Sequence, residues 1–303
     1  MAGNGIRSRA RNLQTGTVYS LPLTVWISLF FLVPMVIVFV YSFLTRDTGG
    51  GVRWEFSLDA YTQIFKQTAE GKFIYLDILV YTLVMAVSAT VLTILVALPC
   101  AYYIARTKNN TLLLFLVIIP FWVNFMIRIY AWVAILGQSG ILNELLVAMG
   151  LIKEPIQFLF NDYAVLLVLV YTNLPFAILP LFTTIEKFDF GLLEAARDLG
   201  ATHPASLRKV MLPNIQGGIV TAVLFTFIPI FGTFAVPDVM GNASTYMLGQ
   251  LITSKIKYTG DYPMASSLSV LILILTAGGL ILFTALNRKQ EKDRQVTIGE
   301  EAE

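Results

Sequence analysis

Six long stretches without a charged residue constrain this chain more than any other feature. The longest separates Arg11 from Arg46, and the shortest separates Lys108 from Arg128. A helix needs about 20 mostly apolar residues, at about 1.5 Å each, to cross a bilayer. Backbone amides in lipid must bond within their own segment, so each stretch is predicted to form a transmembrane helix. The predicted spans are 19–44, 76–105, 112–136, 163–183, 214–236 and 264–286.

The composition is that of a membrane protein. The chain has 303 residues, of which 56% are apolar and 13% charged, and its mean hydropathy is +0.73. Soluble chains are about 25% charged. We therefore expect an all-α membrane protein with one transmembrane domain over 19–286, flanked by cytoplasmic segments at 1–18 and 287–303. Segments 45–75 and 239–254 show no decisive pattern.

Lysine and arginine are unevenly divided between the two sides of the predicted spans. The side that holds both termini carries 13 of them, and the other side carries seven. Because these residues are enriched in cytoplasmic loops, both termini are predicted to lie in the cytoplasm of a multi-pass protein of the cell inner membrane. The first span resembles a signal peptide, but its apolar run is longer than about 7–15 residues, so we expect an uncleaved anchor. The net charge of +2 does not indicate nucleic-acid binding.

Side chains that carry enzyme chemistry are scarce. Cys100 and His203 are the only cysteine and histidine, which excludes an internal disulfide and metal sites built from several such residues. The chain has no G-x-x-x-x-G-K-[ST] phosphate loop, no H-E-x-x-H and no G-x-S-x-G. We expect no catalytic residue, no cofactor and no metal. An ion-driven secondary transporter is a rival class, but it would need carboxylates at mid-depth, and the predicted spans hold none.

The cytoplasmic segment 186–213 is predicted to form two short helices with a break between them. Asp189 can cap the first helix, and Gly200 supplies the positive φ that ends it. His203 fits the cap position of the second helix, and Pro204 fits its first turn. Such a segment suits either a groove on another protein or the lipid surface. Its apolar residues recur at helical spacing: Leu192, Leu193, Ala196 and Leu199, then Leu207, Val210 and Met211.

This segment carries a spaced motif: Glu194-Ala195-Ala196, three residues, Gly200, nine residues, then Val210-x-Leu212-Pro213. The pattern resembles the EAA loop of ABC importer permeases, with Val210 in place of the family's isoleucine. The resemblance implies a type I ABC importer permease fold, in which this loop is the cytoplasmic coupling helix that docks on the ATPase subunit. The residues carried over as ATPase contacts are Glu194, Ala195, Ala196, Gly200, Leu212 and Pro213.

A narrower resemblance concerns three stretches outside this loop. Residues 120–132, 140–144 and 260–265 are similar to spermidine/putrescine permease subunits. The resemblance implies a permease for polyamines, with ferric iron or another small solute as the alternative. It also implies the partners: a second permease subunit, two copies of an ATPase that hydrolyses the ATP, and an extracytoplasmic substrate-binding protein.

A path for polyamines should offer carboxylates to the ammonium groups, and aromatic faces to both the ammonium groups and the methylenes. Asp238 follows Pro237, where the fifth predicted span meets the predicted outer surface. Aromatic residues lie near the same side of the third, fourth and fifth spans. The candidate substrate path comprises Asp238, Tyr130, Trp132, Tyr171, Phe231 and Phe234.

Arg128 is the one ionised residue well inside a predicted span. An arginine at the centre of a bilayer costs roughly 2.5–3.5 kcal/mol on insertion scales, so it must reach water, face a cavity or find a carboxylate. Asp162 and Asp238 flank the outer ends of other spans and could reach it. We expect a structural ion pair, while a direct role in the path stays open.

Overall fold

The computed structural model describes residues 20–68, 71–242 and 245–300. Within these residues the chain is mostly helical, with one two-stranded sheet. It divides into two compact units, each built from segments far apart in the sequence. The first combines the residues up to Ile64 with Ser254–Ile274, and the second combines Phe65–Thr253 with the residues from Leu275 onward.

The first unit contains a long apolar helix over Ser20–Tyr41. None of its side chains from Ser20 to Val40 is buried. So continuous an apolar surface is stable only against lipid or another protein. The helix includes the π-helical turn η1 (Ser28–Leu32) and α2 (Val33–Tyr41). The helix is followed by β1 (Leu44–Arg46), β2 (Val52–Phe56) and α3 (Asp59–Ile64). Two further helices, α14 (Leu248–Thr259) and α15 (Tyr262–Glu300), belong partly to each unit.

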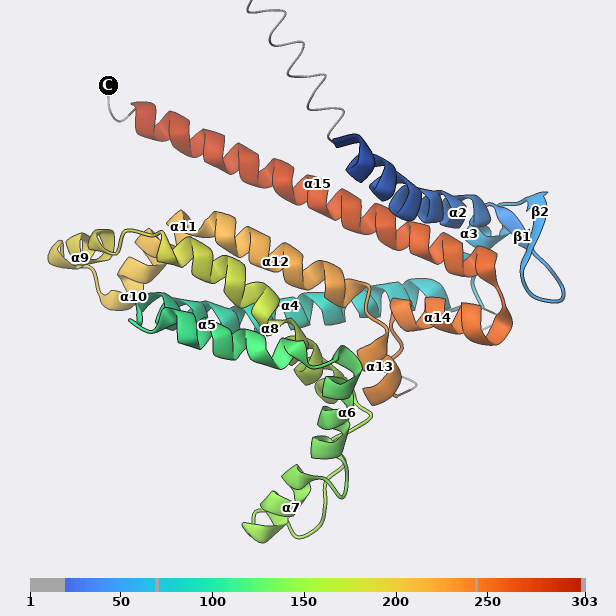
Figure 1. Ribbon diagram of the computed structural model, residues 1–303, viewed down its shortest axis with the longest axis horizontal. Coiled ribbons are helices and arrows are strands. Elements are labelled where there is room, and N and C mark those ends of the chain that lie inside the picture. Colours follow the sequence, from blue (N-terminus) through green and yellow to red (C-terminus); the bar gives the residue numbers. More distant parts are fainter. Residues whose placement is uncertain (1–19, 69–70, 243–244, 301–303) are drawn as a thin grey trace, which may run out of the picture. The chain divides into compact units, whose positions relative to one another are not determined.

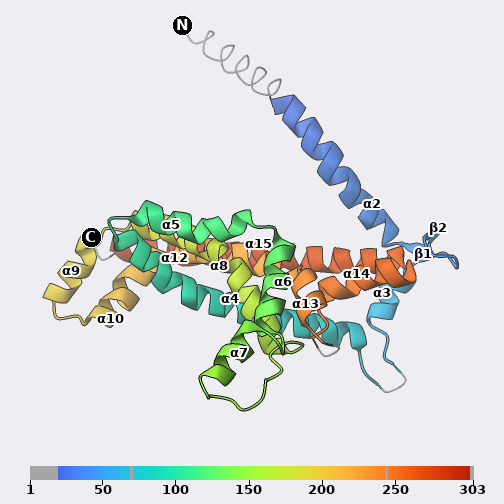
Figure 2. The same cartoon turned by 60° about the horizontal axis from the view of Figure 1, so that its bottom comes forward.

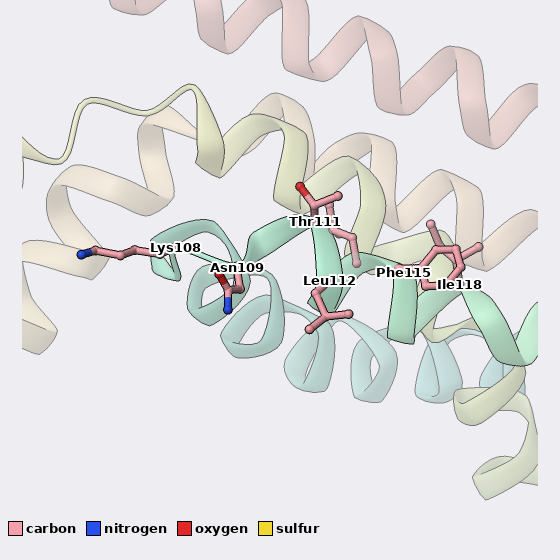
Figure 3. Close-up of a pocket in the computed structure, with 7 residues that line it drawn as sticks. Lys108, Asn109, Thr111, Leu112, Phe115 and Ile118 are labelled. Carbon is pink, nitrogen blue, oxygen red and sulfur yellow. The ribbon is translucent and has the colours of Figure 1, made fainter.

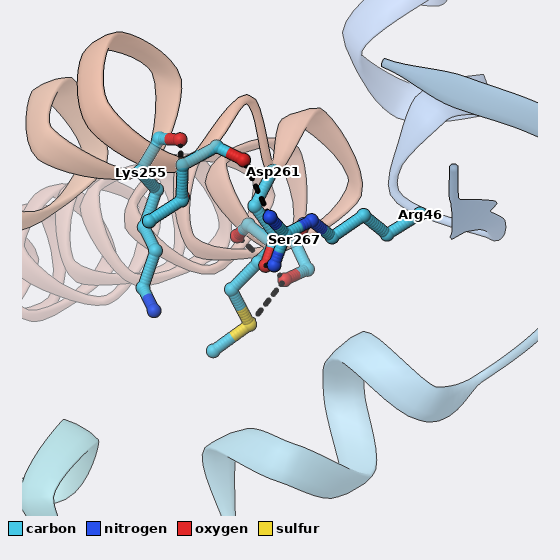
Figure 4. Close-up of polar contacts among 6 residues, drawn as sticks. Arg46, Lys255, Asp261 and Ser267 are labelled. Atoms are coloured by element: carbon cyan, nitrogen blue, oxygen red, sulfur yellow. Dashed lines mark hydrogen bonds and ion pairs between the residues drawn. The ribbon is translucent and has the colours of Figure 1, made fainter. Parts of the chain in front are cut away.

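The antiparallel hairpin of β1 and β2 is fastened to the turn between α14 and α15. The N–H of Gly51 donates to the carbonyl of Gly260 at 3.0 Å, and Gly260 has φ +58, which favours glycine there. The guanidinium of Arg46 donates to the carbonyl of Thr259 at 2.6 Å and lies 4.0 Å from the carboxylate of Asp261 (Figure 4). The turn is thus held by both backbone and charge.

The second unit is a packed group of helices. Its main elements are α4 (Ile74–Arg106), α8 (Asp162–Glu186) and α12 (Gln216–Phe231). Helix α8 packs against α4 and α12, which also contact each other (Figure 1). Small residues in the core allow the helix axes to approach closely. The core includes Ala97, Ala101 and Ile104 of α4, Ala177, Leu181 and Ile185 of α8, and Ala222 of α12.

Buried hydroxyl groups in this unit are hydrogen-bonded. Thr90 of α4, Thr172 of α8 and Thr226 of α12 each donate to the carbonyl four residues earlier, at 2.7 to 2.9 Å. One hydroxyl connects two elements, because Oγ1 of Thr82 accepts from the N–H of Leu248 at 2.9 Å. An unpaired polar group in an apolar interior is costly, so these bonds allow threonine inside the group.

The third predicted span, 112–136, is wrong as a single helix. Pro120 has no N–H with which to continue the helix. The side chain of Asn124 accepts from the N–H of Met126 at 2.9 Å and so caps a new helix. Figure 1 shows α6 turning away from the direction of α5. The stretch consists of α5 (Asn110–Ile118), the 3₁₀ helix η2 (Ile119–Trp122) and α6 (Phe125–Leu136).

Among the described residues, five helical segments are long and apolar enough to cross a membrane. The helix His203–Asn214 and α12 meet at a bend of 74°. If they count together as one span, the number of candidate spans rises to six. The prediction of an all-α membrane fold is confirmed. The five segments are Ser20–Tyr41, Ile74–Arg106, Phe125–Ala148, Asp162–Glu186 and Tyr262–Ile281.

Three span boundaries differ from the prediction. Helix α12 ends at Phe231, before the predicted end of 214–236, and a separate helix α13 (Ala235–Met240) follows. Helix α15 continues beyond 286 to Glu300. The span that includes α6 continues through α7 (Ile141–Ala148). Apolar composition locates a span, but local capping decides where its helix ends.

Candidate functional site

The segment 186–213 forms the predicted pair of short helices. Gly200 has φ +90, as predicted for the end of the first helix. At its start the N–H of Gly191 donates to Oδ1 of Asp189 at 2.9 Å, but the cap position is Phe190 and not the predicted Asp189. The prediction of His203 as the second cap is wrong, because His203 is already helical and the extended Thr202 precedes it. The elements are α9 (Gly191–Asp198), α10 (His203–Ser206), the π-helical turn η3 (Leu207–Met211) and α11 (Leu212–Asn214).

Helices α9 and α10 lie at one end of the second unit, beside the ends of α4 and α8 (Figures 1 and 2). Leu193 of α9 and Met211 of η3 are buried. They belong to the same apolar cluster as Ile104 of α4 and Ile185 of α8. The inner side of the segment is therefore packed into the helix group.

Arg106, the last residue of α4, provides a second anchor. Its guanidinium carbon lies 5.4 Å from the ring centre of Phe190 and 5.8 Å from that of Tyr102. It also donates to the hydroxyl of Tyr102 at 3.0 Å. A cation–π contact contributes about 0.5–1 kcal/mol at an exposed site. The start of α9 is thus held against α4.

The tip of the segment is exposed. Leu199 is 90% exposed, although it was predicted to lie on an apolar face with Leu193. The turn that carries Leu199 is packed from behind, and its outer side is open. Of the six predicted ATPase contacts, Glu194, Ala195 and Gly200 are exposed, whereas Ala196, Leu212 and Pro213 are half-buried.

The predicted substrate-path residues are only partly brought together. The rings of Trp132 in α6 and Tyr171 in α8 are in edge contact, with centres 5.3 Å apart. Phe231 is buried and stacks on another phenylalanine of α12. Asp238 accepts a hydrogen bond of 3.4 Å from the side chain of Gln250. Tyr130, Phe234 and Asp238 are exposed.

The predicted ion pair of Arg128 is wrong within the part of the chain that the structure describes, where neither of the two ion pairs involves it. Its guanidinium carbon instead lies 4.2 Å from the ring centre of Phe121 and 5.6 Å from that of Phe125. Arg128 is 9% exposed, and its Nε and one terminal nitrogen have no hydrogen-bond partner. Aromatic faces, rather than Asp162 or Asp238, stabilise this charge.

A cavity of 390 Å³ lies at the opposite end of α8 from α9. The hydroxyl of Tyr81 in α4 donates to Oδ1 of Asp162 at 3.1 Å and so links α4 to α8. Sequence reasoning considered Asp162 as a partner of Arg128 and as one of several outer carboxylates, but not as a partner of Tyr81. No local pattern joins residues 81 and 162, because helix packing alone brings them together. The cavity is lined by Met85, Asn161, Asp162, Tyr163, Leu166 and Asn242.

The backbone beside this cavity is strained and held by hydrogen bonds. Phe160 has φ +62, the only positive φ of a non-glycine residue in the described parts of the chain. Such a conformation costs about 1–3 kcal/mol and persists only where the surroundings enforce it. The N–H of Phe160 donates to the carbonyl of Met240 at 3.0 Å, and the side chain of Asn242 donates to the carbonyl of Phe160 at 2.6 Å. Strain held in this way is typical of functional sites.

A groove of 770 Å³ runs along α5 and is mainly apolar (Figure 3). In Figure 3 the side chain of Lys108 extends away from the apolar residues Leu112, Phe115 and Ile118. The described lining of this groove contains no carboxylate. The mainly apolar surface of the groove suits lipid or another apolar partner.

Comparison with known families identifies the chain. The family model described as "binding-protein-dependent transport system inner membrane component" matches residues 93–295, which include the segment 186–213 and most of the packed helices. The chain belongs to this family. This permease is therefore a multi-pass inner-membrane component of a transport system.

Several curated relatives are similar over nearly the whole permease. The spermidine/putrescine transport system permease protein PotB of Escherichia coli K12 is 36% identical over 269 residues, which is 88% of this chain and 96% of that protein. PotB of Haemophilus influenzae is 38% identical over 88% of this chain and 93% of that protein. The inner membrane ABC transporter permease protein YdcU of E. coli K12 is 32% identical over 66% of this chain and 68% of that protein.

Solved structures share the fold of the permease. A bacterial ABC transporter that imports the acidic polysaccharide alginate aligns with a TM-score of 0.70 and 17% identity, over 94% of this chain and 98% of that chain. A second structure, in complex with an alginate pentasaccharide-bound periplasmic protein, aligns with a TM-score of 0.73 and 16% identity, over 93% and 96%. These likenesses support the ABC importer permease fold.

Proposed function

We propose that this permease is one subunit of an ATP-driven importer that moves polyamines into the cytoplasm. The proposal rests on the 36% identity to the spermidine/putrescine permease of E. coli, which extends over 88% of this chain. Similarity of this extent covers the packed helices as well as the segment 186–213. It favours polyamines over ferric iron, because the relatives at 36% and 38% identity are spermidine/putrescine permeases.

The permease requires partners for this task. Its sequence holds no phosphate loop, so we assign ATP hydrolysis to a separate ATPase, present in two copies. The exposed turn at Leu199 and Gly200 is the surface on which that ATPase would dock. A second permease subunit would complete the path, and an extracytoplasmic binding protein would deliver the solute. The periplasmic protein bound to the alginate transporter supports this last assignment.

The charge distribution supports an orientation with both termini in the cytoplasm. The side of the membrane that holds the termini carries 13 lysine and arginine residues against seven on the other. Helix α8 has 25 residues and is therefore roughly 38 Å long, enough to cross a hydrocarbon core of about 30 Å. In this orientation α9 lies on the cytoplasmic side, and the cavity at Asp162 lies at the outer end of α8.

Cysteine labelling tests the orientation. In a Cys100→Ala background, Asn109→Cys should resist an impermeant thiol reagent added to intact cells, whereas Tyr258→Cys should react with it. Both positions are exposed, so a difference in labelling reports the side of the membrane and not burial. Permeabilised cells are the control, in which both cysteines should react. The reverse pattern in intact cells would overturn both the orientation and the proposed docking of the ATPase.

Transport by the assembled complex tests the substrate. The permease would be purified with its ATPase, second permease and binding protein, placed in proteoliposomes and supplied with ATP and radiolabelled spermidine or putrescine. We expect uptake that needs ATP and that unlabelled polyamine suppresses. Uptake of ferric iron but not of polyamines would reject polyamines as the transported solute. Uptake driven by an ion gradient without ATP would reject the transporter class.

A further inference from the structure

The cavity at the start of α8 combines one anionic group with both polar and apolar walls. Asp162 provides a carboxylate, and Met85 and Leu166 provide apolar side chains. The ring of Tyr163 also lines the cavity and is 83% exposed, so one of its faces is open to a ligand. The volume of 390 Å³ lies within the range of about 300–1,000 Å³ that is typical of small-molecule sites.

The charge of Asp162 has no cationic partner among the described residues. Both ion pairs in that part of the chain involve other carboxylates. The hydroxyl of Tyr81 is a neutral donor, and it reaches only Oδ1. Asp162 also lies in the first turn of α8, where a negative charge is favourable. A carboxylate in this state can accept charge-assisted hydrogen bonds from a cationic ligand.

The frame around this carboxylate is fixed. Both backbone polar groups of the strained Phe160 are hydrogen-bonded: its N–H donates to Met240 at the end of α13, and its carbonyl accepts from Asn242. The side chain of Asn161 accepts from the N–H of Ala164 at 2.9 Å and so caps α8 directly before Asp162. These bonds hold the end of α8 against the segment that follows α13. The carboxylate is therefore presented at a set position, as a binding group requires.

We propose that this cavity binds a primary ammonium group of an alkyl amine, with Asp162 as its counter-ion. The adjacent methylenes would lie against Met85 and Leu166, and the face of Tyr163 would offer a second contact to the cation. The inference rests on the proposed function, because it names the place where a polyamine is bound by this subunit. It also replaces Asp238 with Asp162 as the principal carboxylate of the path.

Two substitutions separate a ligand role from a structural one. Asp162→Asn keeps an oxygen that can accept from Tyr81 but removes the charge, whereas Tyr81→Phe removes that hydrogen bond but keeps the charge. In proteoliposomes with the assembled complex, Asp162→Asn should raise the KM for spermidine about tenfold with little change in maximal rate. Tyr81→Phe should raise the KM for spermidine less than Asp162→Asn does. Glu144→Gln, at a carboxylate in the first turn of α7, is the matched control and should leave KM unchanged.

The opposite ranking would overturn the site. If Tyr81→Phe reduces the amount of assembled complex while Asp162→Asn leaves KM unchanged, the pair only fastens α4 to α8. Equilibrium binding of radiolabelled spermidine to the complex of both permeases and the ATPase, purified without the binding protein, tests the site without transport. If Asp162→Asn weakens this binding and Glu144→Gln does not, the result supports the site. It does so even if the wild-type complex fails to transport spermidine, a failure that would reject the proposed function. Absent binding, or binding that Asp162→Asn does not weaken, would overturn the site.

Discussion

Gly200→Val is expected to lower ATP-driven uptake about tenfold or more while the permease still inserts into the membrane. Gly200 has φ +90, a conformation that a β-branched residue adopts only with strain of about 1–2 kcal/mol or more. A Cβ atom at this position would meet no heavy atom within 4 Å, so the effect comes from the backbone and not from a clash. Relief of the strain would redirect the chain between α9 and α10 and displace Leu199 from the docking surface.

Gly200→Asn is the matched control, because asparagine adopts the left-handed conformation far more readily than valine. It should retain most of the uptake. The measurement compares three quantities for each variant: the amount of permease in the membrane, co-purification of the ATPase, and uptake per molecule. Normal ATPase binding and normal uptake in Gly200→Val would contradict the assignment of this turn to coupling. Equal loss in both variants would show that the side chain, and not the backbone, is the cause.

The features that sequence predicted well are those that a local pattern determines. Lipid forces backbone amides to bond within a segment, so long uncharged stretches identify spans without knowledge of their packing. The positive φ of Gly200 and the hydrogen bond that the N–H of Gly191 donates to Asp189 likewise follow from short-range rules. The break in the third span was missed because Pro120 and Asn124 interrupt the helix without interrupting the apolar run.

The other missed features depend on how side chains and helices pack. Arg128 was expected to pair with a carboxylate, because that argument counted only charges and not the faces of Phe121 and Phe125. Leu199 was placed on one apolar face with Leu193, but Leu193 is buried and Leu199 is 90% exposed. The bond between Tyr81 and Asp162 joins residues that only the packing of α4 on α8 brings together. The bond between Tyr81 and Asp162 has no sequence signature, whereas Phe125 and Arg128 are helical neighbours three residues apart.

Gly218→Leu is expected to destabilise the packed helices strongly. Gly218 of α12 is buried against α8, and a Cβ atom there would lie 2.6 Å from the Cβ of Thr184. Thr184 has little freedom to move away, because its hydroxyl donates to the carbonyl of Pro180 at 2.9 Å. Overpacking of this kind costs about 1–3 kcal/mol in the free energy of unfolding. An added Cβ atom alone would clash, and a leucine side chain is far larger. We expect a lower melting temperature in detergent and less folded permease in the membrane.

The neighbouring glycine provides a control with the same chemistry. Gly217 is exposed on the same helix, and a Cβ atom there would meet nothing within 4 Å. Both substitutions remove a glycine from α12, which by itself favours the helix by about 0.5–1 kcal/mol. Gly217→Leu should therefore leave the melting temperature unchanged or raise it slightly, while Gly218→Leu lowers it. If the two variants melt together, α12 does not pack on α8 through Gly218, and the close approach of these two helices is wrong.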